Sequence, residues 1–310
     1  MEDKEPGRFT PARFLFNGEG GCVKPDVKCG LCILEWVYGR TVSQNNGRDI
    51  PQLFRNIAGL LYNKIETSTN LGDLCNEAVD LIYKFVAPTS EFWEEIKTKT
   101  NAYVKTLLPG AKRFIAKAGN ERERVERALY LAAAGNVAPM GAPSGALAFP
   151  EAAELAEGMG CEPILIGDAH DAVRRAKNVL YVTDNAGEIG FDSLLISELK
   201  NMGLKVAVVV KDPPYFEDAT MEDARWFGVN RTADRIITVK KVFVPGKDEG
   251  PASEAYRESD LVIIKGTGNY DALRGETEGK TAIFLLKVKC DPIARDTGVT
   301  EGKFVIRLDK

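Results

Sequence analysis

The second half of the chain alternates short apolar runs with segments of helical spacing. Five runs rich in Val and Ile stand at 179–183, 205–210, 235–239, 261–265 and 282–288. They are apolar at nearly every position, which is typical of strands buried on both faces of a parallel sheet. Helical patterns such as FDSLLISELKNMG and MEDARWFG lie between several of them. This alternation predicts an α/β fold with a doubly wound, Rossmann-like and mostly parallel sheet.

The first half follows a different period. From about Asp26 to Leu131, apolar residues recur three and four positions apart, as in IPQLFRNIAGLLYNKI and NERERVERALYLAAA. Asp73, Ser90 and Asn120 are expected helix N-caps, because their short polar side chains can accept hydrogen bonds from free backbone N–H groups. This half of the chain predicts an all-helical domain.

A stretch rich in Gly, Pro and Ala at 135–150 separates the two patterns. We therefore expect an irregular N-terminal arm over 1–25, a helical domain over 26–150 and an α/β domain over 151–310. A length of 310 residues agrees with about two domains.

Composition and charge narrow the classes of function. Hydrophobic residues make up 44% and charged residues 28%, as in ordinary globular proteins. A net charge of -4 gives no general attraction to a polyanion, so we expect no nucleic-acid partner. The start, MEDKEPGRF, does not resemble a signal peptide, and no run approaches the roughly 20 apolar residues of a membrane span. We expect a cytoplasmic protein without a membrane partner, and leave its oligomeric state open.

The cysteines allow three interpretations. Cys29 and Cys32 form a C-x-x-C pair, which fits zinc binding, redox chemistry or two small buried side chains. A tetrahedral zinc site needs four ligands, and no second pair of suitable spacing follows, while the single histidine, His170, lies far along the chain. We favour a structural role for the pair. The other cysteines are Cys22, Cys75, Cys161 and Cys290.

Polar residues and glycines follow the predicted strands, at the edge where such sheets bind ligands. They are Asp184, Asn185 and Glu188; Asp212, Glu217 and Asp218; Gly266, Gly268 and Asn269; and Lys287 and Lys289. Each group alone is as compatible with a turn, a helix cap or a solvated lysine. Together they combine oxygen ligands suited to a hard divalent metal with the lysines and backbone N–H groups that bind phosphate. The set predicts a metal-assisted reaction at phosphorus.

Two phosphate-binding motifs are absent. GETEGKT (275–281) has three residues between its glycines where a P-loop needs four, and a strand follows where a helix is required. GTGNYD lacks the third glycine of the dinucleotide fingerprint.

Several motifs together resemble one family, the metal-dependent damage-control phosphatases, long catalogued as a domain of unknown function. The motifs are LYVTDNAGEIGFD, the EDAT loop, VIIKGTGNYDAL, LLKVKC and the AAAGN segment that ends at Asn136. The resemblance runs from KPDVKCGLC to VKCDPIARDTGV and is closest to the archaeal and bacterial variant with an N-terminal C-x-x-C. It implies a helical N-terminal region packed on a three-layer α/β/α Rossmann-like domain.

The resemblance also implies a site. Asp184, Asn185 and Asp218 would bind one divalent ion, commonly manganese, cobalt, nickel or magnesium, and Lys289 would bind the phosphate. Asp184 and Asp218 would be candidates for a direct catalytic role, with the nucleophile left open between water and an aspartate. The residues expected on the substrate side are Asn269, Gly266, Gly268, Lys265, Glu188 and Asn136. Family members often have Asn or Ser at the position of Glu217, a difference expected to alter the surroundings of the neighbouring ligand.

The implied function is a phosphomonoester hydrolase that removes phosphate from a small phosphorylated metabolite, such as a sugar phosphate or a phosphorylated cofactor intermediate, in metabolite damage control. One alternative is a carboxyl methyltransferase using S-adenosylmethionine, which fits a Rossmann-like sheet and the name of one human relative, an acidic-residue methyltransferase. However, DNAGE stands where its glycine-rich loop should follow the first strand. A non-catalytic metal-binding protein is the other alternative. The physiological substrate and the native metal are left open.

Overall fold

The structure is a computed structural model that describes residues 13–14, 23, 25–42, 49–66, 68–87, 91–143, 149–157, 159, 162–247, 249–277 and 279–310. The described helices are α1 (Val27–Val42), α2 (Ile50–Lys64), α3 (Leu71–Ile82), α4 (Glu91–Ala116), α5 (Glu121–Ala134), α6 (Pro150–Ala156), α7 (Ala169–Arg175), α8 (Glu188–Asn201), α9 (Met221–Trp226), α10 (Val229–Thr232), α11 (Pro251–Glu258), α12 (Thr267–Leu273) and α13 (Asp291–Thr297). The strands are β1 (Arg13–Phe14), β2 (Ile164–Ile166), β3 (Asn178–Val182), β4 (Lys205–Lys211), β5 (Arg235–Val239), β6 (Leu261–Lys265), β7 (Thr281–Lys287) and β8 (Phe304–Asp309).

All the described strands belong to one sheet in the order β1-β2-β8-β7-β6-β3-β4-β5. Every neighbouring pair is parallel except β7 and β8. The carboxyl ends of β3 to β7 therefore meet along one edge of the sheet. The order reverses between β3 and β6, and such a switch point opens a crevice at the carboxyl edge where ligands bind in doubly wound folds. The mostly parallel α/β sheet predicted from the sequence is confirmed.

The five strands predicted from apolar runs are β3 to β7, with bounds that agree to within one residue. The sequence reading missed β1, β2 and β8. β1 has only two residues and lies in the arm that was expected to be irregular. β2 has only three residues between Pro163 and Gly167, too few to show a pattern. β8 ends in alternating charged residues at the antiparallel side of the sheet, so it lacks the continuous apolar character by which the others were found.

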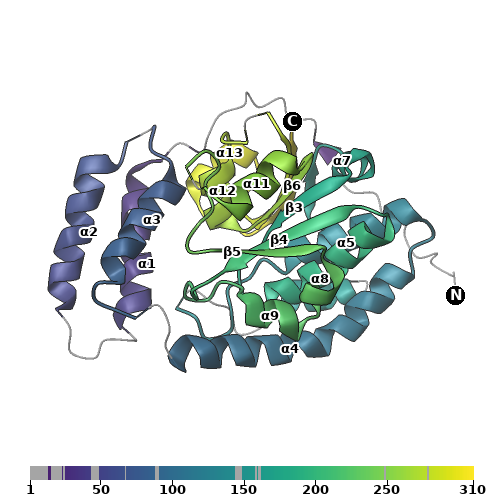
Figure 1. The fold of residues 1–310 in the computed structure, drawn as a ribbon, viewed down its shortest axis with the longest axis horizontal. Coiled ribbons are helices and arrows are strands. Elements are labelled where there is room, and N and C mark those ends of the chain that lie inside the picture. Colours follow the sequence, from purple (N-terminus) through teal and green to yellow (C-terminus); the bar gives the residue numbers. More distant parts are fainter. Residues whose placement is uncertain are drawn as a thin grey trace, which may run out of the picture.

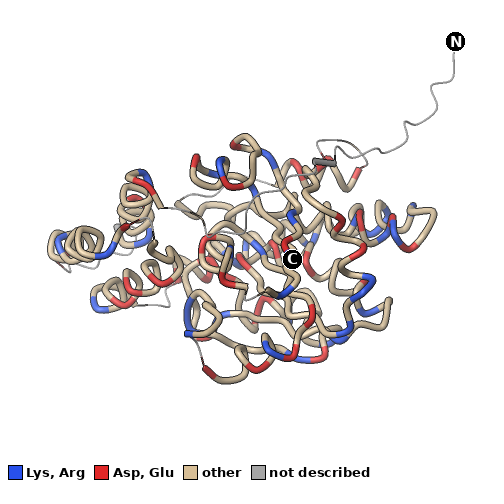
Figure 2. Tube along the Cα trace, turned by 90° about the horizontal axis from the view of Figure 1, so that it is seen from above, with Lys and Arg blue, Asp and Glu red and all other residues tan. Residues whose placement is uncertain are grey.

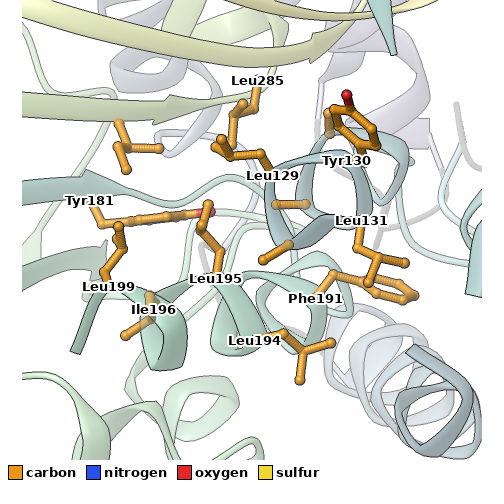
Figure 3. Close-up of a cluster of buried hydrophobic side chains, with 14 of the residues drawn as sticks. Leu129, Tyr130, Leu131, Tyr181, Phe191, Leu194, Leu195, Ile196, Leu199 and Leu285 are labelled. Carbon is orange, nitrogen blue, oxygen red and sulfur yellow. The ribbon is translucent and has the colours of Figure 1, made fainter. Parts of the chain in front are cut away.

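Two hydrophobic cores cover the two faces of the sheet. Alternate residues of a strand enter different cores, with Tyr181 of β3 in one and Leu180 in the other. Helices α4 to α10 contribute mainly to the first core, and α1 to α3 with α11 to α13 contribute to the second. In the first core, Tyr181 and Leu285 from the sheet lie near Leu195 of α8 and Leu129 of α5 (Figure 3). The arrangement is a three-layer α/β/α sandwich.

The helices of the first half divide into two groups. In Figure 1, α1, α2 and α3 stand together at one side of the molecule, beside α12 and α13. Helix α5 instead lies against the sheet, where it contacts β7 and β8, and α4 lies over α5, α6 and α8. Because both hydrophobic cores contain residues from each side of position 150, the expected boundary there does not separate two cores.

The helix N-caps predicted from the sequence were partly correct. Asn120 caps α5 as predicted, accepting a hydrogen bond from the Glu123 N–H. Helix α3 begins two residues before Asp73, and its cap is Asn70, which accepts from the Asp73 N–H. Ser90, Cys22, Cys161 and most of the expected arm lie outside the described residues.

Figure 2 shows basic and acidic residues interspersed over the trace. Many of these charges pair locally, as Lys64 does with Glu77. Among the described helices, none is long and apolar enough to cross a membrane.

Candidate functional site

The loops after β3 and β4 are joined by backbone hydrogen bonds. The Ala186 N–H donates to the Glu217 carbonyl at 2.9 Å, and the Ala219 N–H donates to the Asp184 carbonyl at 2.8 Å. These bonds set Asn185 directly opposite Asp218 in an antiparallel bridge. Three side chains expected to bind metal are thereby brought together from two loops.

Asp184 lies at the switch point of the sheet, beside the first residue after β6. That residue is Gly266, whose φ of 84° is in the left-handed region. A Cβ on Gly266 would stand 1.9 Å from Asp184 Oδ2. Glycine is therefore required here both by conformation and by close approach. The glycine places the Asp184 carboxylate in the crevice between β3 and β6.

The amide of Asn185 is oriented by its neighbours. Its Nδ2 donates to Asp184 Oδ2 at 3.0 Å and to Glu188 Oε1 at 2.7 Å. No hydrogen bond reaches Asn185 Oδ1 from the described residues. With its amino group committed to two carboxylates, the side chain offers its oxygen as a ligand.

Asn136, which follows the end of α5, connects that helix with Asp184 and Glu188. Its Nδ2 donates to Asp184 Oδ2 at 3.0 Å and to both oxygens of Glu188 at 3.0 and 3.1 Å. Its Oδ1 accepts from the Lys287 backbone N–H at 2.9 Å. Asn136 is fully buried, so the amide serves to hold the two carboxylates relative to β7.

A buried cation lies under the same carboxylates. Lys265, at the end of β6, is 0% exposed, and its Nζ lies 2.9 Å from Asp192 Oδ1 and 3.4 Å from Glu188 Oε2. Its Nζ also donates to the Ala132 carbonyl. Glu188 and Asp192 are likewise 0% exposed. We therefore replace the expected substrate contact of Asn136, Lys265 and Glu188 by a supporting role, because none of the three has surface to offer a substrate.

Helix α12 closes the crevice on the β6 side. Asn269 donates its Nδ2 to the Thr183 carbonyl at 2.9 Å and to the Lys265 carbonyl at 2.8 Å, which links the ends of β3 and β6. Its amino group is thus committed to the backbone. Gly268 is exposed, and a Cβ there would meet open space.

The two lysines after β7 differ. Lys287 pairs with Glu151 at 3.0 Å, and its Nζ lies 4.9 Å from the centre of the Phe304 ring. Lys289 is exposed and has no ion pair or hydrogen bond from its amine within the described part of the chain. Its charge nevertheless acts on Asp184: burial raises the pKa of that carboxyl, and Lys289 opposes the shift. Lys289 is therefore the cation available to an incoming anion.

Residues 27–305 match the family described as "Damage-control phosphatase ARMT1-like domain". The chain belongs to this family. A damage-control phosphatase from Archaeoglobus fulgidus is 33% identical over 285 residues, which is 90% of this chain and 97% of the relative. A damage-control phosphatase from Pyrococcus horikoshii is 31% identical over 235 residues, covering 74% of this chain and 78% of the relative.

The fold also matches a solved member of the family. The crystal structure of a DUF89 family protein from Pyrococcus horikoshii gives a TM-score of 0.73 at 26% identity, covering 93% of this chain and 99% of that chain. The family resemblance noted in the sequence is confirmed, and these relatives support a phosphatase role.

Burial raises the pKa of three carboxyl groups at this edge of the sheet. Burial raises the pKa of Asp218 to about 8, with Lys211 opposing the shift and Asp184 adding to it. Burial also raises the pKa of Asp184, against the charges of Lys289 and Lys265. Burial and the neighbouring Asp184 raise the pKa of Glu188 to about 8. A further positive charge at this position would favour the ionised carboxylates.

The donor set suits a hard divalent cation. Asp184, Asn185 and Asp218 offer two carboxylates and one amide oxygen, the ligand types that magnesium and manganese accept. Within the described residues, no group of three or more His, Cys, Asp or Glu side chains could hold a metal, and this donor set has only two carboxylates beside its amide. Of the C-x-x-C pair, Cys29 is buried and Cys32 is exposed.

Sequence reasoning missed the residues that hold the two loops in place. Asn101 of α4 accepts a hydrogen bond from the Gly187 N–H at 2.8 Å, and Lys97 pairs with Asp223 at 2.8 Å. Lys211 lies 3.5 Å from Asp218 Oδ2. Arg40 of α1 pairs with Glu217. Only the strand-end position of Lys211 could have pointed to it, because the other contacts cross 86 to 177 positions of sequence.

Proposed function

We propose that this chain is a metal-dependent phosphomonoester hydrolase acting on a small phosphorylated metabolite, in the role of metabolite damage control. The observation that carries the proposal is the convergence of Asp184, Asn185 and Asp218 at the switch point of the sheet. The charge of Lys289, whose amine has no partner within the described residues, acts on the Asp184 carboxylate. The relatives named damage-control phosphatases support the reaction class. The substrate class and the metal are our inference.

Asp184, Asn185 and Asp218 would hold one divalent ion, for which manganese, cobalt, nickel or magnesium are suitable. When bound, such an ion polarises a phosphoryl group and balances the charge that develops on its oxygens. The chain's own residues would bind the phosphate and orient the metal ligands. Lys289 would bind the phosphate as a point charge, and the backbone at Gly268 leaves room for the substrate to approach. Glu188 and Asn136 would keep Asp184 and Asn185 oriented.

The test is release of inorganic phosphate from a panel of sugar phosphates and phosphorylated cofactor intermediates, with each of the four metals and with EDTA. We expect turnover with at least one metal and none with EDTA. Asp184→Ala and Asp218→Ala should each remove most bound metal, because the site loses one of two charged ligands. Asn185→Ala should weaken metal binding less.

Full metal occupancy in both aspartate variants, measured by elemental analysis, would refute the ligand assignment. Turnover that is unchanged by EDTA would refute metal dependence. Metal binding without phosphate release from any compound would favour the non-catalytic alternative.

A further inference from the structure

Helix α1 reaches the metal-binding loop through one buried ion pair. Arg40 donates from Nη2 to Glu217 Oε1, across 177 positions of sequence. Both side chains are almost fully buried, with 6% and 5% of their side-chain surface exposed. Since a buried carboxylate needs a partner, Glu217 depends on Arg40 for its charge to be tolerated there.

The guanidinium is itself fixed in place. Its central carbon lies 4.4 Å from the centre of the Trp36 ring and 5.8 Å from that of Phe216. Arg40 also donates to the Trp36 carbonyl at 3.4 Å. A planar cation that stacks on rings and forms a charged hydrogen bond is well defined in direction.

The residue before Glu217 is clamped by rings from other elements. Phe216 has edge or tilted contacts with Trp36 of α1, Tyr83 after α3 and Trp93 of α4, at centroid distances of 5.4 to 5.8 Å. Its φ of 49° is in the left-handed region, which a residue with a Cβ adopts at a cost. The surrounding rings therefore hold a backbone conformation that the isolated segment would disfavour.

Glu217 is joined directly to the proposed metal-binding residues. Asp218 follows Glu217 in the chain, and the Glu217 carbonyl accepts the hydrogen bond from Ala186 that joins the two loops. A shift of Glu217 would therefore move Asp218 relative to Asn185, its bridge partner. We propose that Arg40 is a positioning residue, which fixes the Asp218 carboxylate for metal binding by anchoring Glu217 to helix α1.

This inference rests on the proposed function, since it takes Asp218 as a metal ligand. The test compares Arg40→Met, Arg40→Lys, Glu217→Gln and the double variant Arg40→Met/Glu217→Gln with the wild type. The Kd of Mn²⁺ is measured by electron paramagnetic resonance, and kcat and KM are measured with p-nitrophenyl phosphate and Mn²⁺. Thermal unfolding of each protein shows the folded fraction under assay conditions.

We expect Arg40→Met to weaken Mn²⁺ binding by about 10- to 100-fold in the folded protein, as is typical when a partner of a metal ligand is lost. The double variant should recover at least part of that loss, because Gln removes the unpaired buried charge. Arg40→Lys should lie between Arg40→Met and the wild type, since it keeps the charge but not the planar stack on Trp36. The matched control is Arg307→Met, which breaks another buried ion pair, with Asp309, on β8 and should lower stability without changing the Kd of Mn²⁺.

A wild-type Kd of Mn²⁺ in folded Arg40→Met would overturn the inference, as would a rise in KM with an unchanged Kd, which would make Arg40 a substrate contact. A double variant no better than Arg40→Met would also count against it. If the wild type itself binds no Mn²⁺ and releases no phosphate, the proposed function fails, and that result is distinct from these.

Discussion

Two groups of polar residues stacked at the carboxyl edge of the sheet differ in how their charges are paired. The buried group comprises Asn136, Glu188, Asp192 and Lys265, all without solvent exposure and joined to one another by hydrogen bonds or ion pairs. The open group comprises Asp184, Asn185, Asp218 and Lys289, which lie above it and are only partly buried or exposed, apart from Asn185.

In the buried group, one lysine serves two carboxylates. Burial lowers the pKa of Lys265, but Asp192 and Glu188 raise it more, so that the net shift is upward and the amine stays charged. In the open group, the amine of Lys289 is without a partner in the described residues, while two carboxylates lie close together. We propose that the two groups differ in role, with the buried group fixing positions and the open group binding ligands. Mutations should divide in the same way, between stability and activity.

The largest expected effect is on stability, from Lys265→Met. The change leaves Glu188 and Asp192 buried without their cation, and breaking a buried ion pair from one side typically costs about 3–5 kcal/mol. The free energy of unfolding from urea titration should fall by that amount. Lys205→Met, at an exposed strand position, is the control and should change it by less than about 0.5 kcal/mol. A loss below about 1 kcal/mol for Lys265→Met would show that the buried group does not depend on its cation.

The second effect is on activity, from Lys289→Ala. Loss of a charged contact to a transferring phosphoryl group typically costs about 3 kcal/mol, or roughly 100-fold in rate. We expect that loss in kcat/KM with metal content at the wild-type level, and only partial rescue by Lys289→Arg. Lys287→Ala is the matched control, because its amine pairs with Glu151 and should matter little. If Lys289→Ala retains near-normal kcat/KM, the phosphate binds elsewhere in the open group.

The two groups also show what the sequence could predict. Continuous apolar runs identified β3 to β7, and the residues after them contained every member of the open group. The pattern could not show how deeply each side chain is buried. Lys265 and Lys289 both follow the apolar part of a strand, yet one amine turns under the sheet edge toward α5 and α8, and the other faces solvent.

Contacts between distant segments lay beyond local patterns. Arg40 and Glu217 are separated by 177 positions, and either residue alone is typical of a solvated surface. Similarly, α4 and α5 have the same helical period as α1 to α3, but α5 packs on β7 and β8 while α4 packs on α5, α6 and α8. Periodicity shows which face of a helix is buried and does not show against what it is buried.

A smaller effect concerns Asp271 on α12, a half-buried carboxyl outside both groups. Burial, and then the charge of Asp296, raise the pKa of Asp271 to about 7, above its ordinary value of 3.8. The folded state therefore holds this proton more tightly than the unfolded state, and stability falls as pH rises from about 4 to 7. Asp271→Asn should remove that loss.

The stabilisation that Asp271→Asn gives over the wild type should thus be about 1–2 kcal/mol larger at pH 8 than at pH 4, after allowance for partial solvation of the carboxyl. Urea titrations at both pH values measure the difference. Glu301→Gln, at an exposed turn, changes the net charge equally and should show no such trend. An Asp271→Asn difference that is the same at both pH values would mean that the carboxyl is well solvated.

The smallest expected effect is from the C-x-x-C pair, which lies on α1 and belongs to neither group. Cys29 is buried and its Sγ accepts a hydrogen bond from the Asp26 N–H at 3.4 Å, whereas Cys32 is exposed. Cys29→Ser/Cys32→Ser should therefore cost only about 1 kcal/mol, nearly all of it from Cys29, since serine keeps the acceptor and loses some apolar contact. Comparison of the two single variants by urea titration tests that division. Phosphatase activity should stay within about twofold of the wild type, because the proposed metal and phosphate sites do not include the pair. Stoichiometric zinc that is lost in the double variant would contradict this expectation and make the pair part of a second metal site.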